Sequence, residues 1–141
     1  MNPLDLTVAP PRGPREALAG VVFLPRTIDK VRATLPGGAP GAYNIPGFSE
    51  MQLETLGIEL DAFHAAVADA ADDEGVAAFV TASTTPDRIA EWNAFVLARL
   101  PRNGDRNAAY DAYPWLRERP DLILAVDVLE EDDRQHFAHR N

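Results

Sequence analysis

Apolar residues recur at intervals of three and four along most of this chain, which is the spacing of one face of an amphipathic helix. The clearest such stripe consists of Ile89, Trp92, Val96 and Leu100. Thr85 precedes it and belongs to a residue type that caps helix N-termini, while Pro101 follows it and cannot continue a helix. The pattern therefore predicts a helix between Thr85 and Pro101, with Trp92 in the core.

The strongest local signals surround residues 48–57. Ser49 and Gln52 have the spacing of a capping box, in which two side chains bond the free N–H groups at a helix start. Gly57 is typical of the residue just after a helix, because glycine adopts the left-handed conformation without a steric penalty. A short helix is therefore predicted between Ser49 and Gly57. Further helical segments are expected at 14–20 (a single turn), at 25–35, after Asp61, after Asp72 or Asp73, and within 107–118.

Two stretches lack a clear helical period. Residues 36–48 contain three prolines and four glycines and are predicted to form a loop. We expect this loop to be ordered, because burial of Tyr43 and Phe48 would offset its loss of chain entropy. Residues 122–129 are too short to assign from periodicity, although their valine and isoleucine content favours an extended conformation.

Together these elements predict an all-α fold, a single irregular bundle of about five to seven short helices. Whether residues 122–129, near the C-terminus, form a helix or one short extended segment is left open. The helical domain is expected to span residues 14–130. The proline-rich residues 1–13 are interpreted as a loosely attached N-terminal arm, and the charged residues 131–141 as a tail with one helical turn and a frayed end.

Composition agrees with one globular domain and excludes several classes of protein. With 141 residues, of which 46% are hydrophobic and 25% charged, the chain can bury a core of its own. It has no apolar run of bilayer length, and its first residues lack the basic and apolar segments of a secretory signal. A cytoplasmic protein without a membrane span is therefore expected. The absence of cysteine excludes disulfides, thiolate catalysis and cysteine-bound metal.

The net charge of −9 argues against a general nucleic-acid binder, which needs a basic surface. The charge is unevenly distributed, because residues 1–32 have a net charge of +2 and the remainder has −11. One interpretation is a local anion site on an acidic body. The other, which we favour, is that the N-terminal segment packs against the acidic remainder and is neutralised internally.

Lys30 is the only lysine in the chain, all other basic residues being arginine. Positive charges at Arg26 and Arg32 would lower its pKa and favour a role as nucleophile or base. The alternative is structural, since Asp29 has the i,i+3 spacing for ion pairs with both arginines on an exposed helix face. No sequence motif assigns a catalytic residue, and none points to a cofactor.

Arg15 and Arg26 each follow a proline that can begin a helix, and helix N-termini attract anions. If no carboxylate neutralises them, the two arginines place like charges close together, which favours an anion between them. Guanidinium groups bind carboxylates and phosphates well. The N-terminal segment and the 36–48 loop are expected to form the cleft. The candidate ligand-binding residues are Arg15, Arg26, Lys30, Arg32 and Tyr43.

His136 and His139, with Asp132 and Asp133 just before them, superficially resemble a metal site. They lie close to the C-terminus and lack an obvious third anchoring ligand. No bound metal is therefore expected.

Several short blocks resemble a known family. The most specific are Pro14-Arg15-Glu16, Leu24-Pro25-Arg26 and Ile28-Asp29-Lys30, and similar ones follow at 41–43, 56–58 and 90–93. These residues resemble the signature of a bacterial family known as domain of unknown function 5069, over about residues 10–100. The resemblance implies a small, soluble, mostly bacterial protein and supplies no activity. Family members often have a cysteine in the loop after Tyr43, where this chain has none, so a thiol-dependent role is not implied.

Two functions from different classes follow. One is a non-enzymatic binding module for an anionic small molecule or an acidic segment of a partner protein. The other is a small enzyme acting on an anionic metabolite, with Lys30 and neighbouring arginines in its site. The absence of triad, metal and cofactor motifs favours the module, whereas a closed pocket around Lys30 would favour the enzyme.

Overall fold

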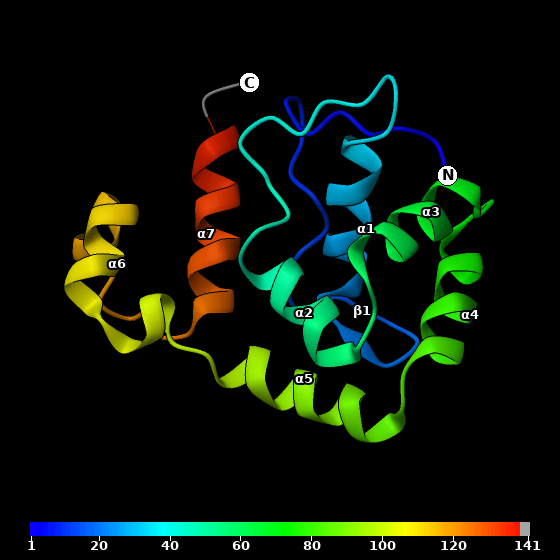
Figure 1. Cartoon of the computed structure of the whole chain (residues 1–141). Helices are drawn as coiled ribbons and strands as arrows, with labels where there is room; N and C mark the ends of the chain where they lie inside the picture. Colours follow the sequence, from blue (N-terminus) through cyan, green and yellow to red (C-terminus); the bar gives the residue numbers. More distant parts are fainter. Residues whose placement is uncertain (139–141) are drawn as a thin grey trace.

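Helices make up most of the chain in the computed structural model, which describes residues 1–138 (Figure 1). The α-helices are α1 (Leu24–Ala33), α2 (Phe48–Leu56), α3 (Leu60–Asp69), α4 (Asp73–Ser83), α5 (Pro86–Ala98), α6 (Arg106–Ala112) and α7 (Ala125–Phe137). Two short 3-10 helices, η1 (Pro101–Gly104) and η2 (Pro114–Glu118), flank α6. The predicted all-α bundle of short helices is confirmed. No helix within residues 1–138 is both long and apolar enough to cross a membrane.

A small hairpin replaces the helical turn predicted at 14–20, and that prediction is wrong. Strands β1 (Ala17–Leu18) and β2 (Val21–Val22) pair antiparallel through the two residues between them. Ala19 and Gly20 both have positive φ, of 52° and 75°, which is the backbone of the tight turns that join paired strands. The pairing places Val21 wholly in the core.

The main core lies between the hairpin and helices α1 to α5. Helix α5 contacts both α2 and β2, and Trp92 on α5 is fully buried, as its place in the apolar stripe predicted. The Phe23 ring, just before α1, meets Phe48 edge-on at 5.9 Å and Trp92 at 6.1 Å. These aromatic contacts join the start of α1 to the start of α2 and the middle of α5.

Local helix signals are confirmed where the partner lies within a few residues. Asp72 accepts a hydrogen bond from the Gly75 N–H at the start of α4, and Thr85 does the same for Arg88 at α5. Gly57 ends α2 in the left-handed conformation with φ of 72°. The cap predicted at Asp61 is wrong, because α3 already begins at Leu60.

The predicted capping box at Ser49 and Gln52 is also wrong. Helix α2 begins at Phe48, and neither side chain bonds the helix start. Both are fully buried, and the Thr27 hydroxyl of α1 lies 3.0 Å from Ser49 Oγ and 2.6 Å from Gln52 Oε1. The Gln52 amide also donates to the Val22 carbonyl at 2.9 Å. Buried polar groups need partners, and here α1 and β2 supply them in place of the helix's own N–H groups.

The N-terminal residues are not the loosely attached arm that their composition suggested. Leu6 is only 1% exposed, and its N–H donates to the Ala39 carbonyl at 2.8 Å. Ala39 in turn donates to the Leu4 carbonyl at 3.0 Å, which ties residues 1–13 to the 36–48 loop. The amino group of Met1 donates to the carbonyls of α3 and the residue after it, at Val67, Ala68 and Ala70.

The C-terminal part settles one open assignment and corrects one prediction. Residues 125–129, left open between helix and strand, are helical, and the same helix α7 continues through Phe137 where a frayed tail was expected. Val126 is buried in the main core, and Val128 is buried in a smaller cluster with Ala109 and Leu116, so burial on several sides accounts for the valine-rich pattern. Helices were correctly predicted within 107–118, where α6 ends before Pro114 and η2 begins at it.

Candidate functional site

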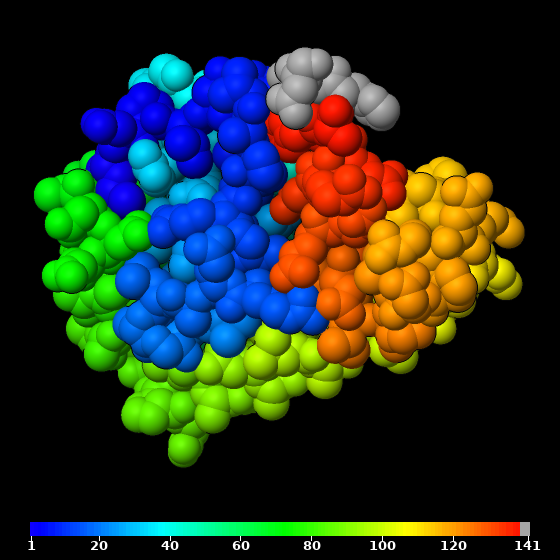
Figure 2. All heavy atoms as spheres, turned by 180° about the vertical axis from the view of Figure 1, so that it is seen from behind, coloured from blue at the N-terminus to red at the C-terminus, as the bar shows by residue number. Residues whose placement is uncertain are grey.

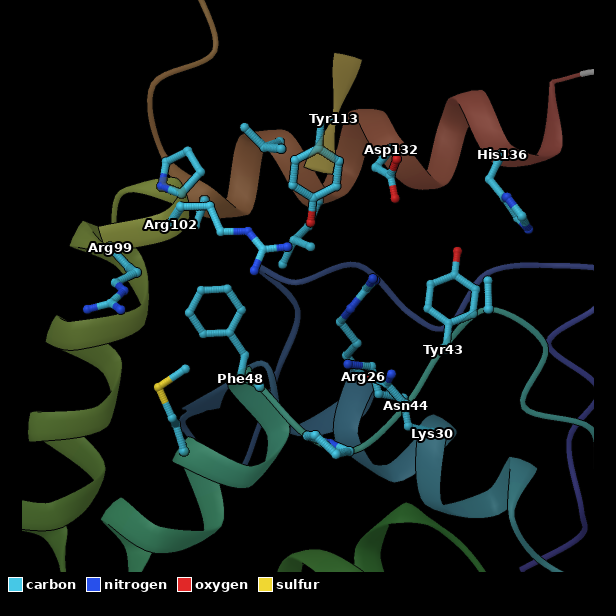
Figure 3. Close-up of a pocket in the computed structure, with 18 residues that line it drawn as sticks. Arg26, Lys30, Tyr43, Asn44, Phe48, Arg99, Arg102, Tyr113, Asp132 and His136 are labelled. Carbon is cyan, nitrogen blue, oxygen red and sulfur yellow. The ribbon is translucent and has the colours of Figure 1, made fainter. Parts of the chain in front are cut away.

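A cavity of about 400 Å³ opens between α1, the 36–48 loop, η1 and α7 (Figure 3). Its charged and ionisable lining consists of Arg26, Lys30, Arg99, Arg102, Asp132 and His136. Its larger apolar and aromatic lining consists of Tyr43, Phe48, Met51, Tyr113, Val128 and Leu129. The cavity thus combines a cationic part with an aromatic part.

Helix periodicity places the first two cations on the same face of α1. Arg26 and Lys30 are four residues apart, so their side chains project from neighbouring turns. Figure 3 shows both on the α1 side of the cavity, facing Asp132 and His136 on α7. One helix therefore supplies fixed positive charge to the cavity, and another supplies groups able to exchange protons.

The other two cations come from the end of α5 and from η1. The Arg99 carbonyl accepts a hydrogen bond from the Ala125 N–H at 2.8 Å, which joins the end of α5 to the start of α7. Arg102 and Asn103 both adopt the left-handed conformation, with φ of 51° and 56°. Residues other than glycine rarely adopt it, so this turn is held by its surroundings with Arg102 at the cavity.

Arg26 is fixed by a buried, bidentate ion pair. Its Nη1 and Nη2 donate to the two carboxylate oxygens of Asp133 at 2.7 and 3.0 Å, and Arg26 is only 2% exposed. The Tyr43 hydroxyl donates to the same carboxylate at 2.8 Å. These bonds connect α1, the loop and α7 on one carboxylate. The Arg26 Nε–H is buried and has no acceptor within the described part of the chain.

Tyr43 and Phe48 hold the loop against the cavity, as expected for an ordered loop, although both are partly rather than fully buried. The Arg26 guanidinium lies 5.5 Å from the centre of the Tyr43 ring, which gives the ring a cation–π contact. Burial, together with the negative charge of Asp133, raises the pKa of Tyr43. Tyr43 therefore remains a neutral hydrogen-bond donor throughout the physiological pH range.

Lys30 lines the cavity without a carboxylate partner, unlike Arg26 on the turn before it. Its Nζ has no hydrogen bond or ion pair with any residue in 1–138, and it lies 5.5 Å from the centre of the Phe23 ring. Burial, followed by repulsion from Arg26, lowers the pKa of Lys30 to about 8. The amine is thus placed in a setting that favours its neutral form.

Lys30→Met is expected to raise the free energy of unfolding at pH 7 by about 1–3 kcal/mol, because it removes a partly buried ammonium. The pKa of Lys30 is about 8 in the folded state and 10.5 ordinarily, so the unfolded chain binds more protons between these values. The stability of the unsubstituted protein therefore rises over this window, and the advantage of the variant shrinks. Urea unfolding at pH 7 and pH 10 measures both effects. If Lys30→Met and the unsubstituted protein had equal free energies of unfolding at pH 7, solvent would be screening the Lys30 charge, and the prediction would be wrong.

Asp132 lies on the opposite wall, and burial raises its pKa. A hydrogen bond from the Trp115 side chain opposes this rise in part. Asp132 is the only carboxylate of the described chain that lines the cavity. His136 lies one turn further along α7, with its ring centre 6.3 Å from that of Tyr43.

His139, the other half of the candidate metal pair, lies outside the described residues. Within residues 1–138 no group of three or more histidine, aspartate or glutamate side chains could hold a metal ion.

The structure brings Arg26, Lys30 and Tyr43 together at the cavity but not Arg15 or Arg32. The Arg32 Nε donates to the Asn2 carbonyl at 2.9 Å. No helix follows Pro14, so the prediction that Arg15 and Arg26 share an anion at two helix N-termini is wrong.

Carboxylates neutralise the arginines of the N-terminal segment, as the favoured interpretation of the charge asymmetry held. Arg15 contacts Asp127 and Glu130 on α7 at 2.5 and 2.8 Å, and Arg12 bridges Asp29 and Asp73. Figure 2 shows the N-terminal segment, in blue, packed directly against α7, in orange and red. These ion pairs account for the basic character of residues 1–32.

Arg99, Arg102 and Tyr113 were not predicted as site residues. The left-handed turn at Arg102 is followed by glycine in the sequence Asn103-Gly104, which marks a turn but not the direction of the arginine. Arg99 and Arg102 lie about seventy residues from α1 in sequence, so only the docking of α7 between them and α1 creates the cavity.

The comparison with curated proteins found no match. A family model described as a domain of unknown function, DUF5069, matches residues 8–135, a range that includes α1, the 36–48 loop and η1. Since the match extends over most of the sequence, the chain belongs to this family.

Proposed function

We propose that this protein is a binding module for a small organic anion that has an aromatic or other apolar part, held in the cavity between α1, η1 and α7. The observation that carries the proposal is the charge of the lining. Four cationic side chains line the cavity of a protein whose net charge is −9, namely Arg26, Lys30, Arg99 and Arg102. Asp133 pairs with Arg26, and Asp132 also lines the cavity, but Lys30, Arg99 and Arg102 have no carboxylate partner within residues 1–138. An anion between these three cations would relieve their mutual repulsion.

The hydrogen-bonding state of the arginines supports the same proposal. The Nη groups of Arg26 are bonded to Asp133, but its buried Nε–H has no acceptor in the described part of the chain. A carboxylate or phosphate oxygen is the natural acceptor for such a donor. The aromatic and aliphatic wall formed by Tyr43, Phe48 and Leu129 would cover the apolar part of the ligand.

Phenylpropanoate is expected to bind, because it combines a carboxylate with an aromatic ring, and the neutral phenylpropanamide is expected to bind much more weakly. Isothermal titration calorimetry measures both. Arg102→Ala should weaken phenylpropanoate binding by about tenfold or more, since a hydrogen bond to a charged group contributes roughly 1.5–3 kcal/mol. Added salt should weaken it as well, because the cavity is open to solvent.

Arg117→Ala is the matched control for this experiment. It removes the same charge from an exposed position on η2 that does not line the cavity, and its guanidinium lies over the Tyr110 ring at 4.7 Å. The control should bind phenylpropanoate as the unsubstituted protein does. Equal weakening by both substitutions would show that net charge rather than the cavity attracts the ligand, and equal binding of acid and amide would contradict an anion site.

An enzymatic function is the second candidate, and the environment of Lys30 is the observation that favours it. The amine lines a cavity and lacks an ion-pair partner within residues 1–138. This is the setting in which a lysine reacts rather than only attracts charge. The binding module remains our first proposal, because it requires only the charge and shape of the cavity.

A further inference from the structure

We propose that Lys30 is a nucleophile that forms a reversible imine with the ligand of this cavity, and that the ligand is a carbonyl compound bearing an acidic group, such as a 2-oxo acid with an apolar side chain. This inference rests on the proposed anion-binding function and names its substrate class.

The partners of Lys30 distinguish it from the other cations near the N-terminus. Arg12, Arg15 and Arg26 each donate to one or two carboxylates, with distances between 2.5 and 3.3 Å. Lys30 has no such acceptor among residues 1–138, and its Nζ lies over the Phe23 ring. The nitrogen is therefore not engaged by the carboxylates that bind its neighbours.

The charge next to Lys30 is fixed. Arg26 lies one turn earlier on α1 and is held by both oxygens of Asp133, so it cannot move away when a second cation approaches. Burial and the fixed guanidinium both penalise the ammonium form, and the negative charge of Asp133 opposes them only in part. The pKa of Lys30 is about 8 as a result, and about a tenth of the amine is neutral at pH 7.

Arginine cannot form an imine under these conditions, so Lys30 is the only side chain of the whole sequence suited to this reaction. The other primary amine, at Met1, donates to three backbone carbonyls of the α3 end. It does not line the cavity. A test that locates the modified amine therefore has only two positions to distinguish.

The step balances without an oxidant or reductant. The neutral Lys30 amine adds its lone pair to the carbonyl carbon, and a proton passes from nitrogen to the former carbonyl oxygen to give a carbinolamine. The nitrogen lone pair then expels that oxygen as water, with one proton taken from solvent or a cavity acid. The products are one protonated imine and one water. Arg99 and Arg102 would hold the acidic group of the ligand and so direct its carbonyl toward α1.

The experiment uses phenylpyruvate, which adds a ketone to the carboxylate and ring of phenylpropanoate. The protein is incubated with phenylpyruvate and sodium cyanoborohydride, which reduces a protonated imine to a stable secondary amine much faster than it reduces a ketone, and peptides are analysed by mass spectrometry. We expect the adduct on the peptide that contains Lys30 and not on Met1. The initial trapping rate should rise about tenfold between pH 7 and pH 9, in step with the neutral fraction of an amine of pKa about 8.

Two controls accompany this measurement. Lys30→Arg should abolish the adduct while circular dichroism shows an intact helical fold, and Arg117→Ala should trap phenylpyruvate as the unsubstituted protein does. The methyl ester of phenylpyruvate keeps the ketone and removes the negative charge. It should be trapped at least about tenfold more slowly, because it loses the charge-assisted bonds to the arginines.

Failure of the inference differs from failure of the proposed function. Phenylpropanoate binding without a phenylpyruvate adduct at Lys30 would overturn the imine and leave the anion site in place. Equal trapping of acid and ester at Lys30 would overturn the acidic-ligand class while the nucleophile stands. Modification confined to Met1, or unchanged in Lys30→Arg, would show ordinary surface chemistry and overturn the inference.

Discussion

Arg26→Met is expected to lower the free energy of unfolding by about 3–5 kcal/mol, because it leaves the Asp133 carboxylate buried without its cation. Arg26 is 2% exposed and Asp133 is 7% exposed, so water replaces the lost guanidinium poorly. The pair also connects α1 to α7 across more than a hundred residues of sequence. Urea unfolding followed by far-ultraviolet circular dichroism measures the loss.

Arg15→Met is the matched control, since Arg15 also pairs with α7 carboxylates but is exposed. It should cost only about 0–1 kcal/mol. Combining Arg26→Met with Asp133→Asn removes the stranded charge and keeps an acceptor for Tyr43. The double variant should therefore be more stable than Arg26→Met alone by at least about 1 kcal/mol. A cost below about 1 kcal/mol for Arg26→Met would show that solvent reaches Asp133.

Trp92→Ala is expected to lower the free energy of unfolding by about 3–5 kcal/mol, because it empties the centre of the main core. Trp92 is fully buried, and its ring contacts Phe23 and Phe95 at centroid distances of 6.1 and 5.8 Å. The indole N–H also donates to the Val22 carbonyl at 2.7 Å, which attaches the hairpin to α5. Thermal or urea unfolding followed by far-ultraviolet circular dichroism avoids reliance on tryptophan fluorescence.

Trp115→Ala provides the comparison for Trp92→Ala. Trp115 lies in η2, is only partly buried and packs on the smaller cluster around Leu116. Its loss should therefore cost clearly less than the loss of Trp92. Similar losses for the two substitutions, or a loss below about 1 kcal/mol for Trp92→Ala, would contradict the central place of Trp92 in the core.

Much of the helical fold could be predicted because its signals are local. Thr85, Asp72 and Gly57 each act on backbone within a few residues, so their spacing alone decides where a helix starts or ends. Trp92 was placed in the core by helical periodicity, which depends only on neighbouring turns.

The prediction failed where a side chain finds its partner far along the chain. Ser49 and Gln52 have the spacing of a local cap, yet their side chains form hydrogen bonds in the core with Thr27 and the Val22 carbonyl. Periodicity left residues 122–129 open between helix and strand, and their burial against both clusters accompanies the helical state of 125–129. In each case tertiary contacts outweighed a weak local preference.

Sequence patterns alone predicted the helical class, several helix ends, the family resemblance and, among five candidate ligand-binding residues, the three that line the cavity: Arg26, Lys30 and Tyr43. Only folding shows which carboxylates pair with Arg15 and Arg26, and which arginines line the cavity. The pairing depends on α7, whose acidic residues meet α1 and the N-terminal segment from the other end of the chain. Charge attraction acts through space rather than along the sequence, so residue spacing cannot assign partners that only folding brings together.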